Sequence, residues 1–194
     1  MPHAESSLVP AEIETKSQFW SHVYDQLEPL LDGQRNWVSN LANTSALIYN
    51  ALLAFPAHFG TETDKAVNWC GFYIESSHFP KSTDLNSENK QLLLGPFCGK
   101  PACQFINVTP NKARGVCAAA YMDAKTKLVP DVEVYPGHIA CDGETKSEIV
   151  CPLVSGHQVL GVLDLDCLAL AGFDEEDQKG LEKIAELVVK ACDW

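Results

Sequence analysis

Residues 149–166 read IVCPLVSGHQVLGVLDLD and carry the clearest signal for the architecture of this chain. The apolar and β-branched residues predict two strands, 149–154 and 159–166. They are separated by the turn SGHQ, in which Gly156 stands at a position typical of hairpins. Because a short hairpin turn joins antiparallel strands, the centre of the fold is expected to be an antiparallel sheet.

Helical patterns are predicted at both ends of the chain, with strand patterns between them. Asp174, followed three residues later by Asp177, is typical of a capped helix start. The expected class is α+β, with one domain over residues 16–194 and a flexible arm over residues 1–15. The domain is an antiparallel sheet of about six strands, flanked by N-terminal and C-terminal helices. The predicted elements are helices at 16–31, 36–55, 115–124 and after Asp174, and strands at 66–75, 91–97, 104–108, 127–129, 149–154 and 159–166.

The composition is that of an ordinary globular protein. Of the 194 residues, 46% are hydrophobic and 21% are charged, and the formal net charge is −12. This charge opposes binding to phosphate backbones and to anionic lipid surfaces, so neither nucleic acid nor a membrane is expected as a partner. No apolar run approaches the roughly 20 residues of a transmembrane helix, and the first residues lack the pattern of a secretory signal. The expected location is therefore the cytoplasm.

The carboxyl groups of Glu148, Asp164 and Asp166 stand out because of the faces on which strand alternation places them. Asp164 and Asp166 share one face of their strand, whereas Leu163 and Leu165 occupy the other. Close like charges repel, so at least one of the pair is expected to have a raised pKa or a cationic ligand. Glu148 lies at the start of a buried strand, where loss of water would keep it protonated and able to donate a proton. A solvated strand surface remains open as the alternative for all three.

The chain has eight cysteines, which is unusual for a reducing compartment where structural disulfides are rare. One group lies in or next to apolar strands and helices and is expected to pack as small hydrophobic side chains. A second group lies in or beside turn-rich segments, where thiols stay accessible and can be oxidised. Cys117 also lies near the start of a helix, whose dipole favours a thiolate. The packing group is Cys70, Cys151, Cys167 and Cys192, and the accessible group is Cys103, Cys117 and Cys141.

Metal and nucleotide sites have little support in the sequence. There is no Cys-x-x-Cys pair, and His138 with Cys141 forms a single His-x-x-Cys couple without the second couple typical of zinc sites. No Gly-x-Gly-x-x-Gly or Walker motif is present, so neither a metal nor a bound cofactor is expected. Trp69 and Tyr73 share one face of their strand. An aromatic wall near carboxylates suits a small cationic ligand such as the ammonium group of an amino acid.

Several motifs together resemble those of the free methionine-(R)-sulfoxide reductases, a family of GAF-domain enzymes. The resemblance extends over about residues 33–190. It implies a GAF fold, a homodimer, and reduction of free methionine-(R)-sulfoxide rather than of the residue within proteins. The motifs are NWCGFY (68–73), LLLGPFCGKPAC (92–103), RGVC (114–117), PDVEVYPGHIACDGETKSEIV (130–150) and GVLDLDC (161–167).

The resemblance also implies roles for the accessible cysteines. By position, Cys141 matches the family's nucleophile, Cys103 its principal resolving cysteine and Cys117 its third cysteine. The implied reaction passes through a sulfenic acid at Cys141 and a disulfide with Cys103, which thioredoxin reopens as external reductant. Cys98 stands where the family commonly has Gln. It lies close in sequence to Cys103 and is an alternative disulfide partner.

The implied pocket uses residues that the strand patterns had already singled out. Glu148, with Asp166 as a second candidate, matches the acid that serves the sulfoxide oxygen, and Asp164 matches the partner of the ammonium group. Trp69 and Tyr73 match the aromatic wall. The competing interpretation is a non-catalytic GAF module that senses oxidant through its cysteines or binds a small ligand.

Overall fold

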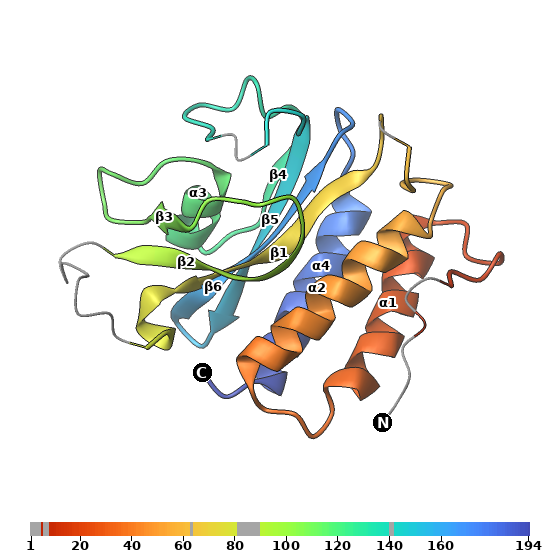
Figure 1. Ribbon diagram of the computed structural model, residues 1–194, viewed down its shortest axis with the longest axis horizontal. Coiled ribbons are helices and arrows are strands. Elements are labelled where there is room, and N and C mark those ends of the chain that lie inside the picture. Colours follow the sequence, from red (N-terminus) through yellow and green to blue (C-terminus); the bar gives the residue numbers. More distant parts are fainter. Residues whose placement is uncertain (1–4, 6–7, 63, 81–89, 140–141) are drawn as a thin grey trace.

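The computed structural model describes residues 5, 8–62, 64–80, 90–139 and 142–194. Its centre is a six-stranded antiparallel sheet in the order β3-β2-β1-β6-β5-β4 (Figure 1). The predicted hairpin forms the neighbouring strands β5 and β6, so the predicted sheet is confirmed. The strands are β1 Val67–Glu75, β2 Gln91–Gly99, β3 Phe105–Asn107, β4 Lys127–Val129, β5 Ser147–Ser155 and β6 Gln158–Cys167.

Helices α1, α2 and α4 cover one face of the sheet, and the short helix α3 lies on the opposite side (Figure 1). Within the described residues, no helix is both long enough and apolar enough to cross a bilayer. The extent of the arm over residues 1–15 stays a prediction. The helices are α1 Lys16–Leu31, α2 Trp37–Leu53, α3 Val116–Asp123 and α4 Glu175–Ala191, and a 3₁₀ turn lies at Ser76–His78.

Alternation along β1 separates the two faces of the sheet, as predicted. Cys70, Phe72 and Ile74 are fully buried and belong to the core beneath the helices. Trp69 and Tyr73 belong to a second, smaller apolar cluster on the side of α3. One face therefore supplies the main hydrophobic core, and the other face is free to form a cavity.

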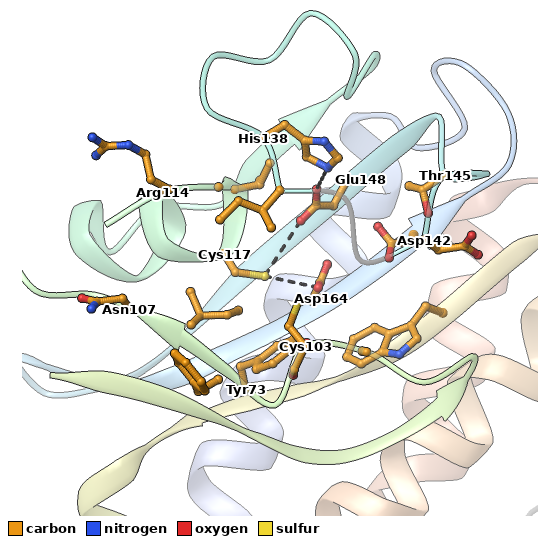
Figure 2. A pocket seen from close by; sticks show the side chains of 18 of the residues that line it. Tyr73, Cys103, Asn107, Arg114, Cys117, His138, Asp142, Thr145, Glu148 and Asp164 are labelled. Atoms are coloured by element: carbon orange, nitrogen blue, oxygen red, sulfur yellow. Dashed lines mark hydrogen bonds and ion pairs between the residues drawn. The ribbon is translucent and has the colours of Figure 1, made fainter. Parts of the chain in front are cut away.

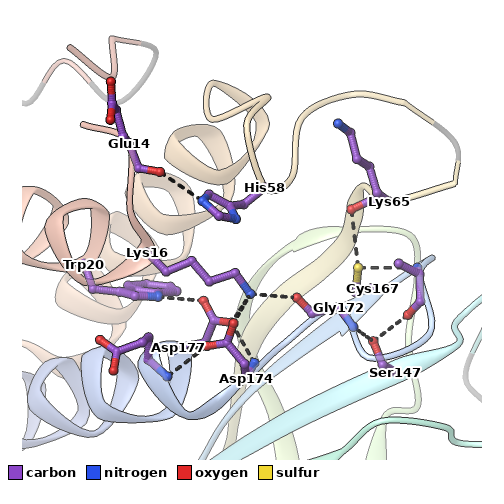
Figure 3. Close-up of polar contacts among 12 residues, drawn as sticks. Glu14, Lys16, Trp20, His58, Lys65, Ser147, Cys167, Gly172, Asp174 and Asp177 are labelled. Carbon is purple, nitrogen blue, oxygen red and sulfur yellow. Dashed lines mark hydrogen bonds and ion pairs between the residues drawn. The ribbon is translucent and has the colours of Figure 1, made fainter. Parts of the chain in front are cut away.

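A buried polar cluster joins the first and last helices (Figure 3). The carboxylate of Asp177 is fully buried and accepts hydrogen bonds from Nε1 of Trp20 (2.8 Å) and from Nζ of Lys16 (2.5 Å). It also accepts a hydrogen bond from the backbone N–H of Asp174, the N-cap of α4 (2.8 Å). Burial raises the pKa of Asp177, and the Lys16 ammonium opposes this rise. The predicted capping pair is confirmed, and it also holds α1 in place.

Asp177→Ala is expected to lower the free energy of unfolding by about 3 kcal/mol, because it leaves the largely buried Lys16 ammonium with only part of its partners. For a chain of this length, the melting temperature should fall by about 6–12 °C. The matched control is Glu176→Ala, which removes a solvent-exposed carboxylate from the same helical turn and should leave the midpoint nearly unchanged. Equal losses of stability in the two variants, measured by urea denaturation, would contradict a stabilising role for the buried contact between Asp177 and Lys16.

Candidate active site

A cavity of about 240 Å³ lies against the sheet face opposite helices α1, α2 and α4. Side chains of β1, β5 and β6 form its floor, and the start of α3, the segment 102–107 and the loop between β4 and β5 form its walls (Figure 2). The cavity is smaller than the roughly 300–1,000 Å³ of pockets for drug-sized ligands. It is therefore suited to a small metabolite.

The pairing of β1, β6 and β5 brings the predicted carboxyl groups together. Asp166 lies opposite Glu148 on β5 and opposite Trp69 on β1. Asp164 lies two residues away on the same face of β6, opposite Gly71. All three carboxyl groups line the cavity, and Glu148 and Asp164 are each only 6% exposed. The alternative of a solvated strand surface is thus wrong for these two, and Asp166 is half-buried.

Stacked aromatic rings form one wall of the cavity. Trp69 stacks on Phe97, with ring centroids 5.5 Å apart, and on Tyr73, with centroids 5.8 Å apart. Gly71 makes this stack possible, because a Cβ there would lie 2.3 Å from Cβ of Phe97 and 2.7 Å from Cη2 of Trp69. The Tyr73 hydroxyl donates a hydrogen bond to the backbone carbonyl of Cys103 (3.0 Å). The aromatic wall therefore also positions the segment that carries Cys103.

Glu148 is the carboxyl group best placed to exchange a proton near neutral pH. Burial raises its pKa from the ordinary 4.5 to about 7, and the neighbouring Asp166 adds to the rise. His138 opposes it, with Nε2 lying 3.6 Å from Oε2 of Glu148 (Figure 2). A carboxyl group with this pKa is partly protonated at pH 7, so it can donate a proton and later recover one.

The thiol of Cys117 lies between two of the carboxyl groups. Its Sγ donates a hydrogen bond to Oδ2 of Asp164 (3.2 Å) and a longer one to Oε1 of Glu148 (3.9 Å) (Figure 2). Burial raises the pKa of Asp164 well above its usual range, and the charge of Glu148 adds to this. Burial and the charge of Asp164 likewise raise the pKa of Asp166. Cys117, Glu148 and Asp164 also offer ligand atoms within 4.8 Å of one another, a grouping that can hold a metal ion.

Two buried polar atoms at the cavity have no hydrogen-bond partner among the described residues. They are Oδ1 of Asp164, an acceptor, and Nε1 of Trp69, a donor. Buried polar groups in native proteins are nearly always paired, so an unpaired donor and acceptor in one cavity suggest that a polar ligand completes them. The ligand would present both hydrogen-bond donors and acceptors.

The structure corrects one of the predictions for the cysteines. Cys103 is half-buried and lines the cavity, in line with an accessible thiol. Cys117 also lines the cavity but is only 7% exposed, and burial with the charges of Asp164 and Glu148 raises its pKa well above the usual range. The prediction of an accessible Cys117 favoured as a thiolate is therefore wrong, because loss of water outweighs the helix dipole. Cys141 lies outside the described residues.

The remaining cysteines lie away from the cavity. Cys98 lies opposite Cys70 in the β1–β2 pairing, so it faces the helices, whereas Cys103 lines the cavity on the other side. This placement does not support Cys98 as a partner of Cys103. The predicted packing group is confirmed as part of the core beneath the helices, namely Cys70, Cys151, Cys167 and Cys192.

Contacts that anchor the loop between β4 and β5 were not predicted from the sequence. Asn68 Nδ2 donates hydrogen bonds to Oδ2 of Asp142 and to Oγ1 of Thr145, each 3.1 Å long. Lys100 Nζ lies 3.1 Å from the same oxygen of Asp142. His138, on the other side of this loop, was noticed only as one half of a His-x-x-Cys couple. Its contact with Glu148 depends on the folded loop, and no local pattern signals it.

The sheet order, with helices on one face and a ligand cavity on the other, is that of a GAF domain. The family model described as "GAF domain" matches residues 66–192. The free methionine-R-sulfoxide reductase of Saccharomyces cerevisiae is 47% identical over 166 residues, which cover 85% of this chain and 81% of the yeast protein. The Escherichia coli protein of the same name is 37% identical over 175 residues, covering 90% and 89% of the two chains.

A solved structure agrees with these relatives. The free methionine-R-sulfoxide reductase of Neisseria meningitidis, determined in complex with its substrate, superposes with a TM-score of 0.75 and 33% identity, covering 95% of both chains. The chain therefore belongs to the free methionine-R-sulfoxide reductase family of GAF-domain proteins.

The raised pKa of Glu148 predicts a pH-dependent gain of stability in Glu148→Gln. Below pH 4.5 the carboxyl is protonated in both folded and unfolded chains, and its contribution to stability is fully present. As the pH rises to about 7, only the unfolded chain releases the proton. The free energy of unfolding therefore falls by up to about 3 kcal/mol. Because Gln stays neutral, the variant should gain stability relative to the unmodified chain from pH 5 to 8.

Urea denaturation at several pH values measures this difference directly. The control is Glu133→Gln, because Glu133 is exposed and its hydrogen bond with Lys146 lowers its pKa. This variant should show no gain as the pH rises. Parallel curves for Glu148→Gln and the unmodified chain between pH 4 and 8 would mean that Glu148 titrates as an ordinary carboxyl group.

Proposed function

We propose that this chain reduces free L-methionine-(R)-sulfoxide to L-methionine, with Cys141 as nucleophile, Cys103 as resolving cysteine and thioredoxin as external reductant. The observation that supports it most strongly is Glu148, a buried carboxyl group with a pKa of about 7 in a cavity of the size of a small metabolite. The relatives of this name, one of them solved with its substrate, supply the substrate class.

The need for a buried acid follows from the chemistry of a sulfoxide. Its oxygen is a poor leaving group, so it must be protonated as the S–O bond weakens. Glu148 holds a proton at neutral pH, and Asp166 is a second candidate because its pKa is also raised. The role of Glu148 predicts that turnover falls as the pH rises through about 7, since its acid form is then lost.

The oxygen passes from substrate to protein in the first step. The thiolate of Cys141 attacks the sulfoxide sulfur while Glu148 delivers a proton to the oxygen. The resulting intermediate carries a bond between the two sulfurs and the OH group on the substrate sulfur. The OH group then moves to the Cys141 sulfur as its bond to the substrate sulfur and the sulfur–sulfur bond break, so methionine leaves reduced by two electrons and Cys141 becomes a sulfenic acid. Ile139 and Asp142, the described residues on either side of the segment 140–141, both line the cavity, which supports Cys141 as the nucleophile.

The thiols are then restored in two exchanges. The Cys103 thiol attacks the sulfenic sulfur of Cys141, a disulfide forms and water leaves. A dithiol of the thioredoxin type reduces this disulfide, returning both thiols and becoming a disulfide itself. Cys103 is half-buried at the cavity, so it combines access to the site with access to a protein reductant. This cycle needs no bound cofactor. We also propose that the protein is cytoplasmic and forms a homodimer.

The cavity also suggests how a free amino acid is distinguished from a residue in a protein. Asp164 Oδ1 is a buried acceptor without a partner among the described residues, and a cationic ammonium group would favour the charged form of this carboxyl. A methionine within a peptide chain has no such ammonium group. The stacked rings of Trp69 and Tyr73 would enclose the rest of the substrate.

The test is coupled NADPH oxidation with thioredoxin and thioredoxin reductase. The substrates are free methionine-(R)-sulfoxide, the S epimer, and a peptide that contains methionine sulfoxide. Turnover is expected with the free R epimer alone, and Cys141→Ser should abolish it. Removal of a general acid lowers rates by about 10²–10⁴-fold, so the turnover rate of Glu148→Gln at pH 7 should be reduced by a factor in that range.

Two outcomes would point elsewhere. Consumption of one sulfoxide per protein molecule, without further turnover, would favour a GAF module that senses oxidant. Full turnover of Glu148→Gln across the pH range would remove Glu148 from the role of acid. Cys151→Ser, a change in the helix-side core on the opposite face of the sheet from the cavity, controls for nonspecific effects of cysteine replacement.

A further inference from the structure

The thiol and carboxyl groups at the floor of the cavity are arranged as a set of metal ligands. Sγ of Cys117 lies 3.2 Å from Oδ2 of Asp164 and 3.9 Å from Oε1 of Glu148. The ligand atoms of these residues all lie within 4.8 Å of one another, and all three residues are buried. They come from α3, β5 and β6, so the packing of separate elements fixes their positions (Figure 2).

These spacings match the coordination shell of zinc. With Zn–S near 2.3 Å and Zn–O near 2.1 Å, the sulfur and an oxygen of a tetrahedral site lie about 3.6 Å apart. The two observed sulfur–oxygen distances lie on either side of that value. Each sulfur–oxygen pair is therefore within about 0.4 Å of the tetrahedral zinc spacing, and the three ligand atoms can occupy three corners of a tetrahedron. The fourth corner would face the cavity, as in zinc sites that keep one open position.

An independent observation indicates that the site can take a ligand. Asp164 is only 6% exposed, and its Oδ1 has no hydrogen-bond partner among the described residues. It lines the cavity, so an ion entering the cavity can reach it. The choice of metal follows from the sulfur, because thiolate ligands favour zinc whereas magnesium and calcium favour sites made only of oxygen.

We propose that Cys117, Glu148 and Asp164 bind Zn²⁺, and that the bound ion blocks the cavity against the sulfoxide substrate. On binding, the thiol proton of Cys117 and any protons on the two carboxyl groups pass to solvent, and sulfur and oxygen lone pairs form the bonds to the metal. No electron is transferred. The inhibitory consequence rests on the proposed function, whereas the zinc site itself does not.

The experiment is equilibrium dialysis of the reduced, full-length chain against Zn²⁺ alone, followed by measurement of bound metal. One equivalent is expected in the unmodified chain, and Cys117→Ser should weaken binding by at least about 10-fold. Cys103→Ser is the matched control, because it removes another thiol that lines the cavity and should leave the zinc affinity unchanged. Loss of zinc in Cys103→Ser with retention in Cys117→Ser would overturn the proposal.

A second variant and a spectroscopic measurement cover the case in which Cys117→Ser does not fold. Asp164→Asn keeps the shape of the side chain and should also lower the affinity for zinc. With Co²⁺ in place of zinc, the unmodified chain and Cys103→Ser should show a thiolate-to-cobalt charge-transfer band, and a protein lacking the Cys117 ligand should not. Full zinc affinity in Asp164→Asn, or the absence of the band in the unmodified chain, would contradict the site.

Competition separates this inference from the proposed function. Free methionine-(R)-sulfoxide should raise the apparent dissociation constant of zinc in proportion to its concentration, and zinc should inhibit turnover reversibly until a chelator is added. If zinc binds through Cys117 but the chain shows no turnover, the zinc site is supported and the proposed reductase function is contradicted. If turnover occurs but zinc does not affect it, the proposed function stands and the proposed inhibition by zinc is contradicted.

Discussion

The structure depends on keeping several carboxyl groups out of water on one face of a single sheet. Register alone places Glu148 opposite Asp166 and keeps Asp164 on the same face, so the strands cannot pair in this way without bringing these like charges together. The cavity cannot hold them all ionised without a counter-charge, and their pKa values rise accordingly. The fold thus holds protons in the cavity at neutral pH, at a cost in stability that the core beneath the helices must offset.

The other face of the sheet supplies that stability. Residues alternate along β1 so that Phe72 packs under the helices while Trp69 points to the cavity. The buried contact of Asp177 with Lys16 ties α4 to α1 and closes the helical layer. Core and cavity thus lie on opposite faces of the same strands, so the core that stabilises the sheet also holds the strands that carry the carboxyl groups.

Local patterns predicted the elements and the side of the sheet that forms the helix-covered core, but not how far the opposite side is covered. Helix α1 and strand β4 occupy the predicted ranges because caps, periodicity and turns are short-range signals. The burial of Glu148 and Cys117 depends on α3 and the β4–β5 loop, which cover the cavity side of the sheet. That covering is set by contacts between segments that are distant in the sequence. His138 was recognised only as a possible metal ligand, since its partner Glu148 comes from another segment. The site could therefore be listed from the sequence by residue type and face, whereas its electrostatics needed the structure.

The account rests on a cavity that raises the pKa of its carboxyl groups and keeps Glu148 partly protonated at neutral pH. The most direct measurement is a pH titration by NMR of the chain labelled with ¹³C at the carboxyl carbons of Asp and Glu, with Glu148→Gln and Asp164→Asn used to assign the signals. The account predicts that Glu148 titrates with a midpoint near pH 7 and that the midpoint of Asp164 lies well above its ordinary value. Midpoints near 4 for both, as in unperturbed carboxyl groups, would contradict it.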